Sequence, residues 1–259
     1  MILHIPHASR EIPPAMRSQI VLSDRELQSE LLAMTDAHTD RLFTCTGATR
    51  IVFPFSRLVV DPERLLYDHQ EPMSGVGMGV IYTRTSKGER LRRNLTSDER
   101  KRLINSYYKP HHERLRNAVE VELASQDLAL IVDCHSFPRR PLPCDSDQSV
   151  PRPDFCVGTD TFHTPEELKR NLIEAIRREG FSVEENRPFA GTIVPSECCR
   201  VDQRVRSIMI EVCRDLYMEE ETGSISERFF QIHLAVEGIL KELRPAESCS
   251  TLSGTHSCG

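Results

Sequence analysis

A chain of 259 residues is long enough for one large domain, and 39% hydrophobic with 28% charged residues is typical of a globular protein in water. The formal net charge of −6 argues against a general nucleic-acid-binding protein, which would need a basic face. No apolar run approaches the roughly 20 residues that a membrane-spanning helix requires. Arginines nevertheless recur in segments that otherwise look interior, and a guanidinium can hold a carboxylate with two hydrogen bonds. This favours an acidic small molecule as the binding partner, not nucleic acid or a membrane.

The first half of the chain predicts short elements. Pro54 interrupts an apolar stretch that would otherwise read as one strand. In order, we expect a strand at 2–6, a helix at 23–34, strands at 50–55 and 57–61, and an irregular segment at 67–94.

The second half alternates more regularly. A helix should break or kink near Pro110, and another should begin with Thr164 as its N-cap. In order, we expect a helix at 96–125, strands at 128–138 and 154–159, a helix at 164–178, strands at 181–186 and 206–214, and a helix at 224–243. This alternation predicts an α/β fold, a three-layer αβα sandwich with a mostly parallel, mixed central sheet. We expect a single domain over 1–243 and a disordered Ser-, Thr- and Gly-rich tail over 244–259.

Two predicted strands end in the same chemistry, HIPHAS and IVDCHSFP. Ligand sites in open α/β sheets lie outside the carboxyl ends of the strands, so His7 and His135 can converge. Alone, each would be an ordinary hydrogen-bonded histidine. Together with a carboxylate from Glu11 or Asp36, they indicate a catalytic zinc site with one position left for water. His4 would face the opposite side of a continuing strand and is expected to be structural.

Glu211 interrupts the apolar run of the strand predicted at 206–214. An ionised carboxylate is costly there unless it is paired or lies near a metal. It could act as a general base, taking a proton from water and passing it to a leaving nitrogen. The alternative is a buried ion pair with Arg214 or another arginine.

Charged residues also gather in RLVVDPER, where Arg57, Asp61 and Arg64 surround a predicted strand end. An arginine here could stabilise an oxyanion or hold a substrate carboxylate. The alternative is a surface salt-bridge cluster.

The nine cysteines do not predict disulfides. The start MILHIPHAS lacks the charged and long apolar regions of a secretory signal, so we expect reduced thiols in the cytoplasm. There is no C-x-x-C pair, and the neighbours Cys198 and Cys199 cannot comfortably hold one ion, which speaks against a structural zinc cage.

Seven stretches between residues 6 and 218 together resemble the N-formylglutamate amidohydrolase family: PHASREIP, TDAHTDRLF, SRLVVDPERL, YYKPHHERL, VDCHSFP, PFAGTIVP and SIMIEVCRDLYM. That family is similar in turn to zinc carboxypeptidases and aspartoacylases, which implies a phosphorylase/hydrolase-like sandwich and one zinc ion. The resemblance implies metal ligands at His7, Asp36 and His135, a general base at Glu211, Arg57 near the carbonyl oxygen, and Arg64 on a carboxylate.

Two stretches depart from the family pattern. Typical members read DLNR where this chain reads DPER at 61–64, so Glu63 adds negative charge beside the carboxylate clamp. The family's Gly-Gly-Tyr is Ala-Gly-Thr here, at 190–192, which reshapes the same pocket. The expected substrate-binding residues are therefore Asp61, Glu63, Arg64, Gly191 and Thr192.

The sequence thus predicts a cytoplasmic, zinc-dependent amidohydrolase that cleaves the C–N amide bond of a small N-acyl (N-formyl) amino acid, with N-formyl-L-glutamate as the first candidate. Glu63 keeps a second hypothesis open, a metal-dependent peptidase or amidase acting on another small peptide or cell-wall amide. A third hypothesis is a non-catalytic small-molecule binder on the same scaffold.

Overall fold

Six strands form one central sheet in a computed structural model that describes residues 1–243; the predicted tail, 244–259, lies outside the described residues. The strands are β1 (Ile2–Ile5), β2 (Thr49–Val52), β3 (Ala129–Phe137), β4 (Phe155–Gly158), β5 (Val183–Glu185) and β6 (Val205–Cys213). Their order across the sheet is β2-β1-β3-β6-β4-β5. All neighbours are parallel except β6 and β4, which are antiparallel. The predicted mixed, mostly parallel α/β sheet is confirmed.

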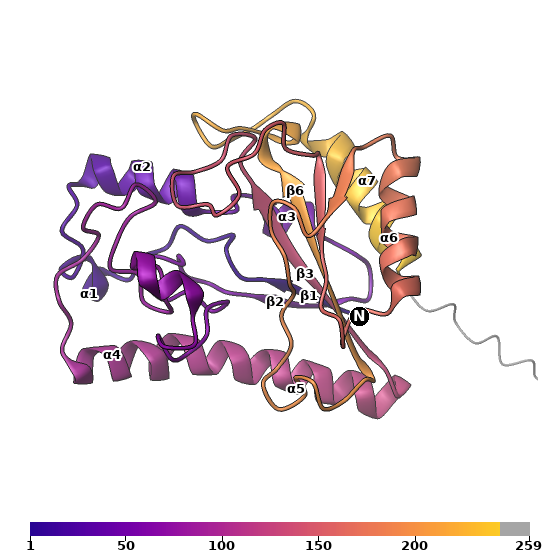
Figure 1. Ribbon diagram of the computed structural model, residues 1–259, viewed down its shortest axis with the longest axis horizontal. Helices are drawn as coiled ribbons and strands as arrows, with labels where there is room; N and C mark the ends of the chain where they lie inside the picture. The colour runs from indigo at the N-terminus through magenta and orange to yellow at the C-terminus, as the bar shows by residue number, and fades with distance from the viewer. Residues whose placement is uncertain (244–259) are drawn as a thin grey trace, which may run out of the picture.

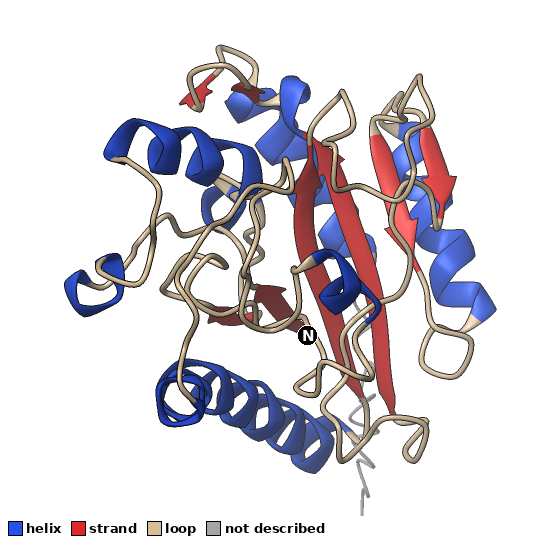
Figure 2. Ribbon diagram, turned by 60° about the vertical axis from the view of Figure 1, so that its left-hand side comes forward, coloured by secondary structure: helices blue, strands red, loops and turns tan. Residues whose placement is uncertain are grey.

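Helices cover both faces of this sheet (Figures 1 and 2). One face packs on α5, and the other packs on α3, α6 and α7. The helices are α1 (Pro14–Arg17), α2 (Asp24–Met34), α3 (Thr39–Leu42), α4 (Ser97–Leu103), α5 (Lys109–Gln126), α6 (Glu166–Arg178) and α7 (Phe229–Glu242). Shorter elements are η1 (Pro72–Val76), η2 (Ile104–Tyr108), η3 (Arg214–Leu216) and a hairpin of β7 (Met218–Glu219) and β8 (Ser224–Ile225).

The face of the sheet that packs on α5 changes from apolar to polar side chains along the strands. Because side chains alternate between faces, Ile2, Ile131 and Val205 all pack toward α5 near the strand starts. Further along β3 and β6, the same alternation brings His135 and Glu211 to this face. The carboxyl ends of the strands therefore carry polar groups above an apolar base.

The helix predicted over 96–125 forms without the expected break at Pro110. Helices α4 and α5 continue one another through η2, a π-helical turn, and form the long rod at the bottom of Figure 1. The N–H of Lys109 donates to the carbonyl of Ile104, five residues back. This wider turn accommodates the ring and the missing N–H of Pro110.

Three other local predictions are wrong. Residues 57–61 form a turn instead of a strand, in which the N–H of Val59 donates to the carbonyl of Ser56 (2.9 Å). Helix α6 starts at Glu166 because the hydroxyl of Thr164 donates to the carbonyl of Ser207 and does not cap the helix. Helix α7 starts at Phe229, not at Ser224, because Ser224 and Ile225 form strand β8 of the β7–β8 hairpin.

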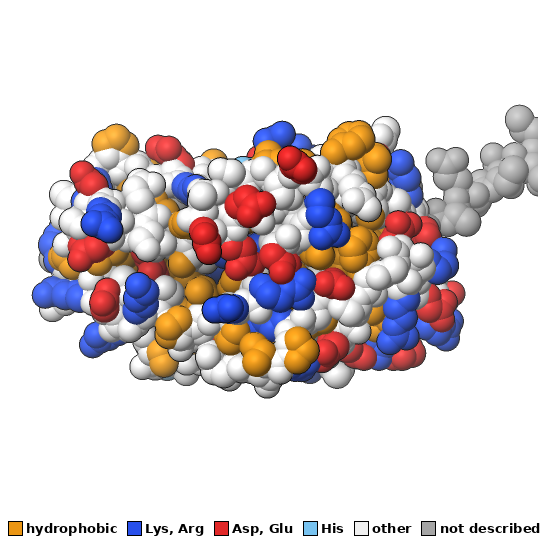
Figure 3. Space-filling model, turned by 90° about the horizontal axis from the view of Figure 1, so that it is seen from above, with side chains coloured by type: hydrophobic (Ala, Val, Ile, Leu, Met, Phe, Trp, Pro, Cys, Tyr) orange, Lys and Arg blue, Asp and Glu red, His pale blue; other side chains and the backbone are white. Residues whose placement is uncertain are grey.

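The outer surface is mixed in charge on the side that Figure 3 displays, where acidic and basic side chains are interspersed with apolar ones. Within residues 1–243, no helix combines the length and the apolar character needed to cross a bilayer.

Candidate active site

Two histidines and one aspartate converge at the carboxyl ends of β1 and β3. The rings of His7 and His135 lie 5.1 Å apart, centroid to centroid. The Oδ2 atom of Asp36 lies 3.6 Å from Nδ1 of His7 and 3.1 Å from Nδ1 of His135. The backbone N–H of Asp36 also donates to the carbonyl of His7 (3.0 Å), which fixes the loop after α2 beside the strand end. All three side chains are buried.

The remaining nitrogen of each ring is held by carboxylates. Nε2 of His7 lies 2.9 Å from Oδ1 of Asp61. Nε2 of His135 lies 3.0 Å from Oδ1 of Asp133 and 2.9 Å from Oε2 of Glu63. Metal-binding histidines typically donate their second ring nitrogen in this way. The two Nδ1 atoms are thus left to face Asp36.

Two carboxylates compete as the third member of this group. Glu63 lies with His7 and His135 in a group in which one ligand atom from each residue is within 4.8 Å of the others. Asp36, by contrast, contacts the Nδ1 atoms of both rings. Nδ1 of His7 has no hydrogen-bond partner among the described residues, so it is free to face an ion. Glu11, the other carboxylate that the sequence suggested, is exposed.

Glu211 lies on β6 directly beside His135 on β3, as its register partner. Its side chain is buried, and Oε2 has no hydrogen-bond partner within the described part of the chain. Burial, reinforced by the negative charges of Asp36 and Glu63, raises the pKa of the Glu211 carboxyl to about 8.

The alternative ion pair between Glu211 and Arg214 does not form. Nη2 of Arg214 instead contacts Oδ1 of Asp36 at 2.9 Å. The other nitrogens of Arg214 donate to the carbonyl of Ala33 (2.7 Å) and to the hydroxyl of Ser136 (3.3 Å).

Asp61 is the centre of a buried network. Besides His7, it accepts from Nη2 of Arg57 (2.7 Å), from the hydroxyl of Tyr82 (2.5 Å) and from the backbone N–H of Glu63 (2.9 Å). Although burial opposes ionisation, the charges of Arg57 and His7 hold the pKa of Asp61 well below its usual range. The charged cluster is therefore interior, and the surface salt-bridge alternative is wrong.

Arg57 and Arg64 differ in how many of their side-chain nitrogens are already bonded to Asp61. Nε and Nη2 of Arg57 both bond to Asp61, which leaves Nη1. Arg64 has one weak contact, 3.6 Å from its Nε to Oδ2 of Asp61, and about a quarter of its side chain is exposed. The hydroxyl of Tyr108 holds the backbone of Arg64 by donating to its carbonyl (3.0 Å).

A cavity of about 610 Å³ joins these groups. Its lining includes His7, Asp36, Arg57, Glu63, Arg64, His135, Glu211 and Arg214. Gly191 and Thr192 are not part of that lining, although Ala190 is. The hydroxyl of Thr192 bonds to Ser207 (2.7 Å), and this directs it to the sheet. Asp61 lies beneath the lining and contacts the groups that form it.

The sequence profile of the N-formylglutamate amidohydrolase family matches residues 1–218. The chain belongs to this family. It is 25% identical over 229 residues to the N-formylglutamate deformylase of Pseudomonas putida, covering 85% of this chain and 82% of that protein. The crystal structure of N-formylglutamate amidohydrolase from Ralstonia eutropha JMP134 superimposes with a TM-score of 0.81 at 26% identity, covering 94% and 91% of the two chains. A gene product from Agrobacterium tumefaciens shares the fold, with a TM-score of 0.69, 21% identity and coverage of 93% and 89%.

In this member of the N-formylglutamate amidohydrolase family, the structure adds polar groups that the sequence analysis missed. Asp133 contacts the rings of both His4 (2.8 Å) and His135. Its signal was present, since it is a carboxylate in a continuous apolar strand, as Glu211 is. Tyr82 had no such signal, because it lies in the irregular segment, where no periodicity marks a buried residue.

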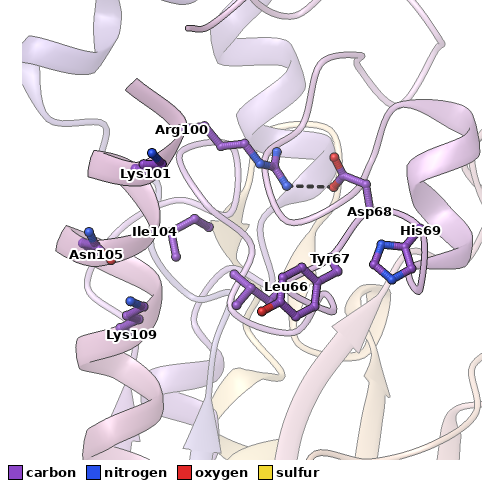
Figure 4. A pocket seen from close by; sticks show the side chains of 9 residues that line it. All are labelled: Leu66, Tyr67, Asp68, His69, Arg100, Lys101, Ile104, Asn105 and Lys109. Carbon is purple, nitrogen blue, oxygen red and sulfur yellow. Dashed lines mark hydrogen bonds and ion pairs between the residues drawn. The ribbon is translucent and has the colours of Figure 1, made fainter. Parts of the chain in front are cut away.

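A second cavity, of about 580 Å³, lies between residues 66–69 and the α4–η2–α5 rod (Figure 4). Arg100 and Asp68 form an ion pair across it at 2.9 Å, and Lys101 and Lys109 also line it. None of the site residues predicted from the sequence lines this cavity.

Proposed function

We propose that this chain is a metal-dependent hydrolase that cleaves the C–N amide bond of a small N-formyl amino acid. The observation that carries the proposal is the meeting of three candidate ligand atoms on His7, Asp36 and His135 beside the buried, unpartnered oxygen of Glu211. The names of the Pseudomonas and Ralstonia relatives make N-formyl-L-glutamate the first substrate to test.

The donor set fits one divalent ion. Two imidazole nitrogens and one carboxylate oxygen are the ligands of many catalytic zinc sites, which leave the fourth position open. Such an ion supplies carbonyl polarisation and acidification of water.

The remaining steps belong to the side chains. The Glu211 carboxylate takes a proton from the attacking water and delivers it to the leaving nitrogen. Nη1 of Arg57 donates to the oxyanion that develops on the carbonyl oxygen. Arg64 holds the α-carboxylate of the amino acid. Asp61 keeps both His7 and Arg57 in orientation.

The test measures metal content and formate release together. Chelation should abolish formate release from N-formyl amino acids, and added zinc should restore it. Asp36→Asn should lose both metal and activity, whereas Glu11→Gln, at an exposed carboxylate on the neighbouring loop, should keep both. Full activity without bound metal contradicts the proposal. Metal-loaded protein that turns over no amide would instead favour a non-catalytic binder.

A further inference from the structure

The cavity offers fewer free cationic groups than N-formyl-L-glutamate has carboxylates. That compound carries an α- and a γ-carboxylate. Every nitrogen of the Arg214 guanidinium is already bonded, to Asp36, Ala33 and Ser136. Two nitrogens of Arg57 are bonded to Asp61, and its third is needed at the carbonyl oxygen. Among the described residues that line the cavity, Arg64 is therefore the one arginine free to hold a carboxylate.

The rest of the cavity is better suited to an apolar group. One wall is formed by Met34, Met73, Met78, Leu142 and Cys144, which belong to or pack on the same hydrophobic cluster beneath α2. Methionine side chains adapt to unbranched or irregular apolar groups. A γ-carboxylate placed against this wall would lose its hydration without gaining a partner, which is unfavourable.

Two acidic residues make the cavity still less suited to a second carboxylate. Asp145 and Asp147 also line the cavity. Asp145 is paired with Arg152 (2.7 Å) and Asp147 with Arg187 (3.3 Å), so neither of these arginines is free to hold a second carboxylate.

We infer that this chain prefers N-formyl amino acids with a neutral, apolar side chain, such as that of methionine or leucine, over N-formyl-L-glutamate. The inference rests on the proposed function and concerns only the side-chain end of the substrate. Arg64 takes the α-carboxylate, Arg57 the carbonyl oxygen, and the methionine wall the side chain.

The decisive experiment compares kcat/KM for N-formyl-L-glutamine and N-formyl-L-glutamate, which differ in charge but hardly in size. We expect the metal-loaded protein to favour the glutamine compound by about tenfold or more, and N-formyl-L-methionine to exceed both. Equal or better turnover of the glutamate compound overturns the inference while leaving the proposed function intact. Failure to hydrolyse any of the three contradicts the proposed function itself.

Binding measurements keep the inference testable without turnover. Calorimetry with metal-loaded Glu211→Gln should rank the same three compounds in the same order. If the glutamate compound binds as tightly as the methionine compound, or if the methionine compound does not bind, the inference is wrong.

A substitution in the wall provides the reciprocal test. Met73→Arg adds a cation to η1, and we expect it to raise the glutamate-to-glutamine ratio of kcat/KM by about tenfold. The matched control is Val76→Arg in the same short helix, because Val76 is exposed and does not line the cavity. An equal change in both variants, or none in Met73→Arg, contradicts the inference.

Discussion

The two halves of the candidate active site are held in place by different means. In the half formed by strands, the register of β3 against β6 fixes His135 beside Glu211, and backbone hydrogen bonds maintain this register. In the half formed by the loop from residue 57 to residue 82, Arg57, Asp61 and Tyr82 hold one another by side-chain contacts. A substitution in the strand half should therefore alter chemistry and leave the fold intact, whereas one in the loop half should alter both.

The largest expected effect lies in the strand half. Glu211→Gln removes the proposed proton acceptor and should lower kcat by about a hundred- to ten-thousand-fold. Because Glu211 is not among the proposed ligands, metal content should stay at the wild-type level. Near-full hydrolysis by the metal-loaded variant would exclude this residue as the base.

In the loop half, Asp61→Asn should affect stability and activity together. The substitution leaves Arg57, whose side chain is only 13% exposed, without its counter-charge, so we expect the free energy of unfolding to fall by roughly 3 kcal/mol. Denaturant titration would measure it. The control is Asp68→Asn, whose exposed pair with Arg100 should contribute less than about 1 kcal/mol. Equal losses in the two variants would argue against a special role for the Asp61 network.

Glu63→Gln tests which carboxylate is a metal ligand. If Glu63 only orients His135, the metal affinity should fall by about 10- to 100-fold, with one ion still bound at saturating metal. Asp36→Asn should lose the ion altogether. The reverse result would make Glu63 the ligand and Asp36 the residue that orients the histidines.

The raised pKa of Glu211 predicts a pH effect on stability in metal-free protein. Folding raises this pKa from 4.5 to about 8, so the associated stabilisation is complete below about pH 4.5 and is lost progressively as the pH rises from 4.5 to 8. Glu211→Gln cannot ionise. It should therefore match the wild type near pH 4 and exceed it by roughly 5 kcal/mol near pH 9. A difference that does not change with pH would contradict the raised pKa.

The smallest effect is expected for Tyr82→Phe. Asp61 keeps its ion pair with Arg57 when the hydroxyl is removed, so the loss should be about 1 kcal/mol in stability. Thermal unfolding would measure this loss of stability, with Tyr67→Phe, at an exposed tyrosine, as the control. A loss as large as that of Asp61→Asn would mean that the hydroxyl, and not the ion pair, holds the loop.

The same contrast explains what could be predicted from the sequence. The strands around His7, His135 and Glu211 could be predicted because apolar runs and alternation are local, and the structure brings these three residues together. The turn at 57–61 could not be predicted. Its valines, Val59 and Val60, read as a buried strand, but they are buried against Ile104 and its neighbours and not within the sheet. Thr192 was expected at the substrate, but only the folded chain reveals its bond to Ser207.

The position of β6 also constrains how the protein is made. This strand lies between β3 and β4, yet it is the last of the six to leave the ribosome. Until residues 205–213 have emerged, β3 and β4 each present an edge with unpaired backbone groups, which is the kind of edge that other chains can join. Truncated chains that end before β6 should therefore aggregate, and Glu211 enters the cavity only when this final strand completes the sheet.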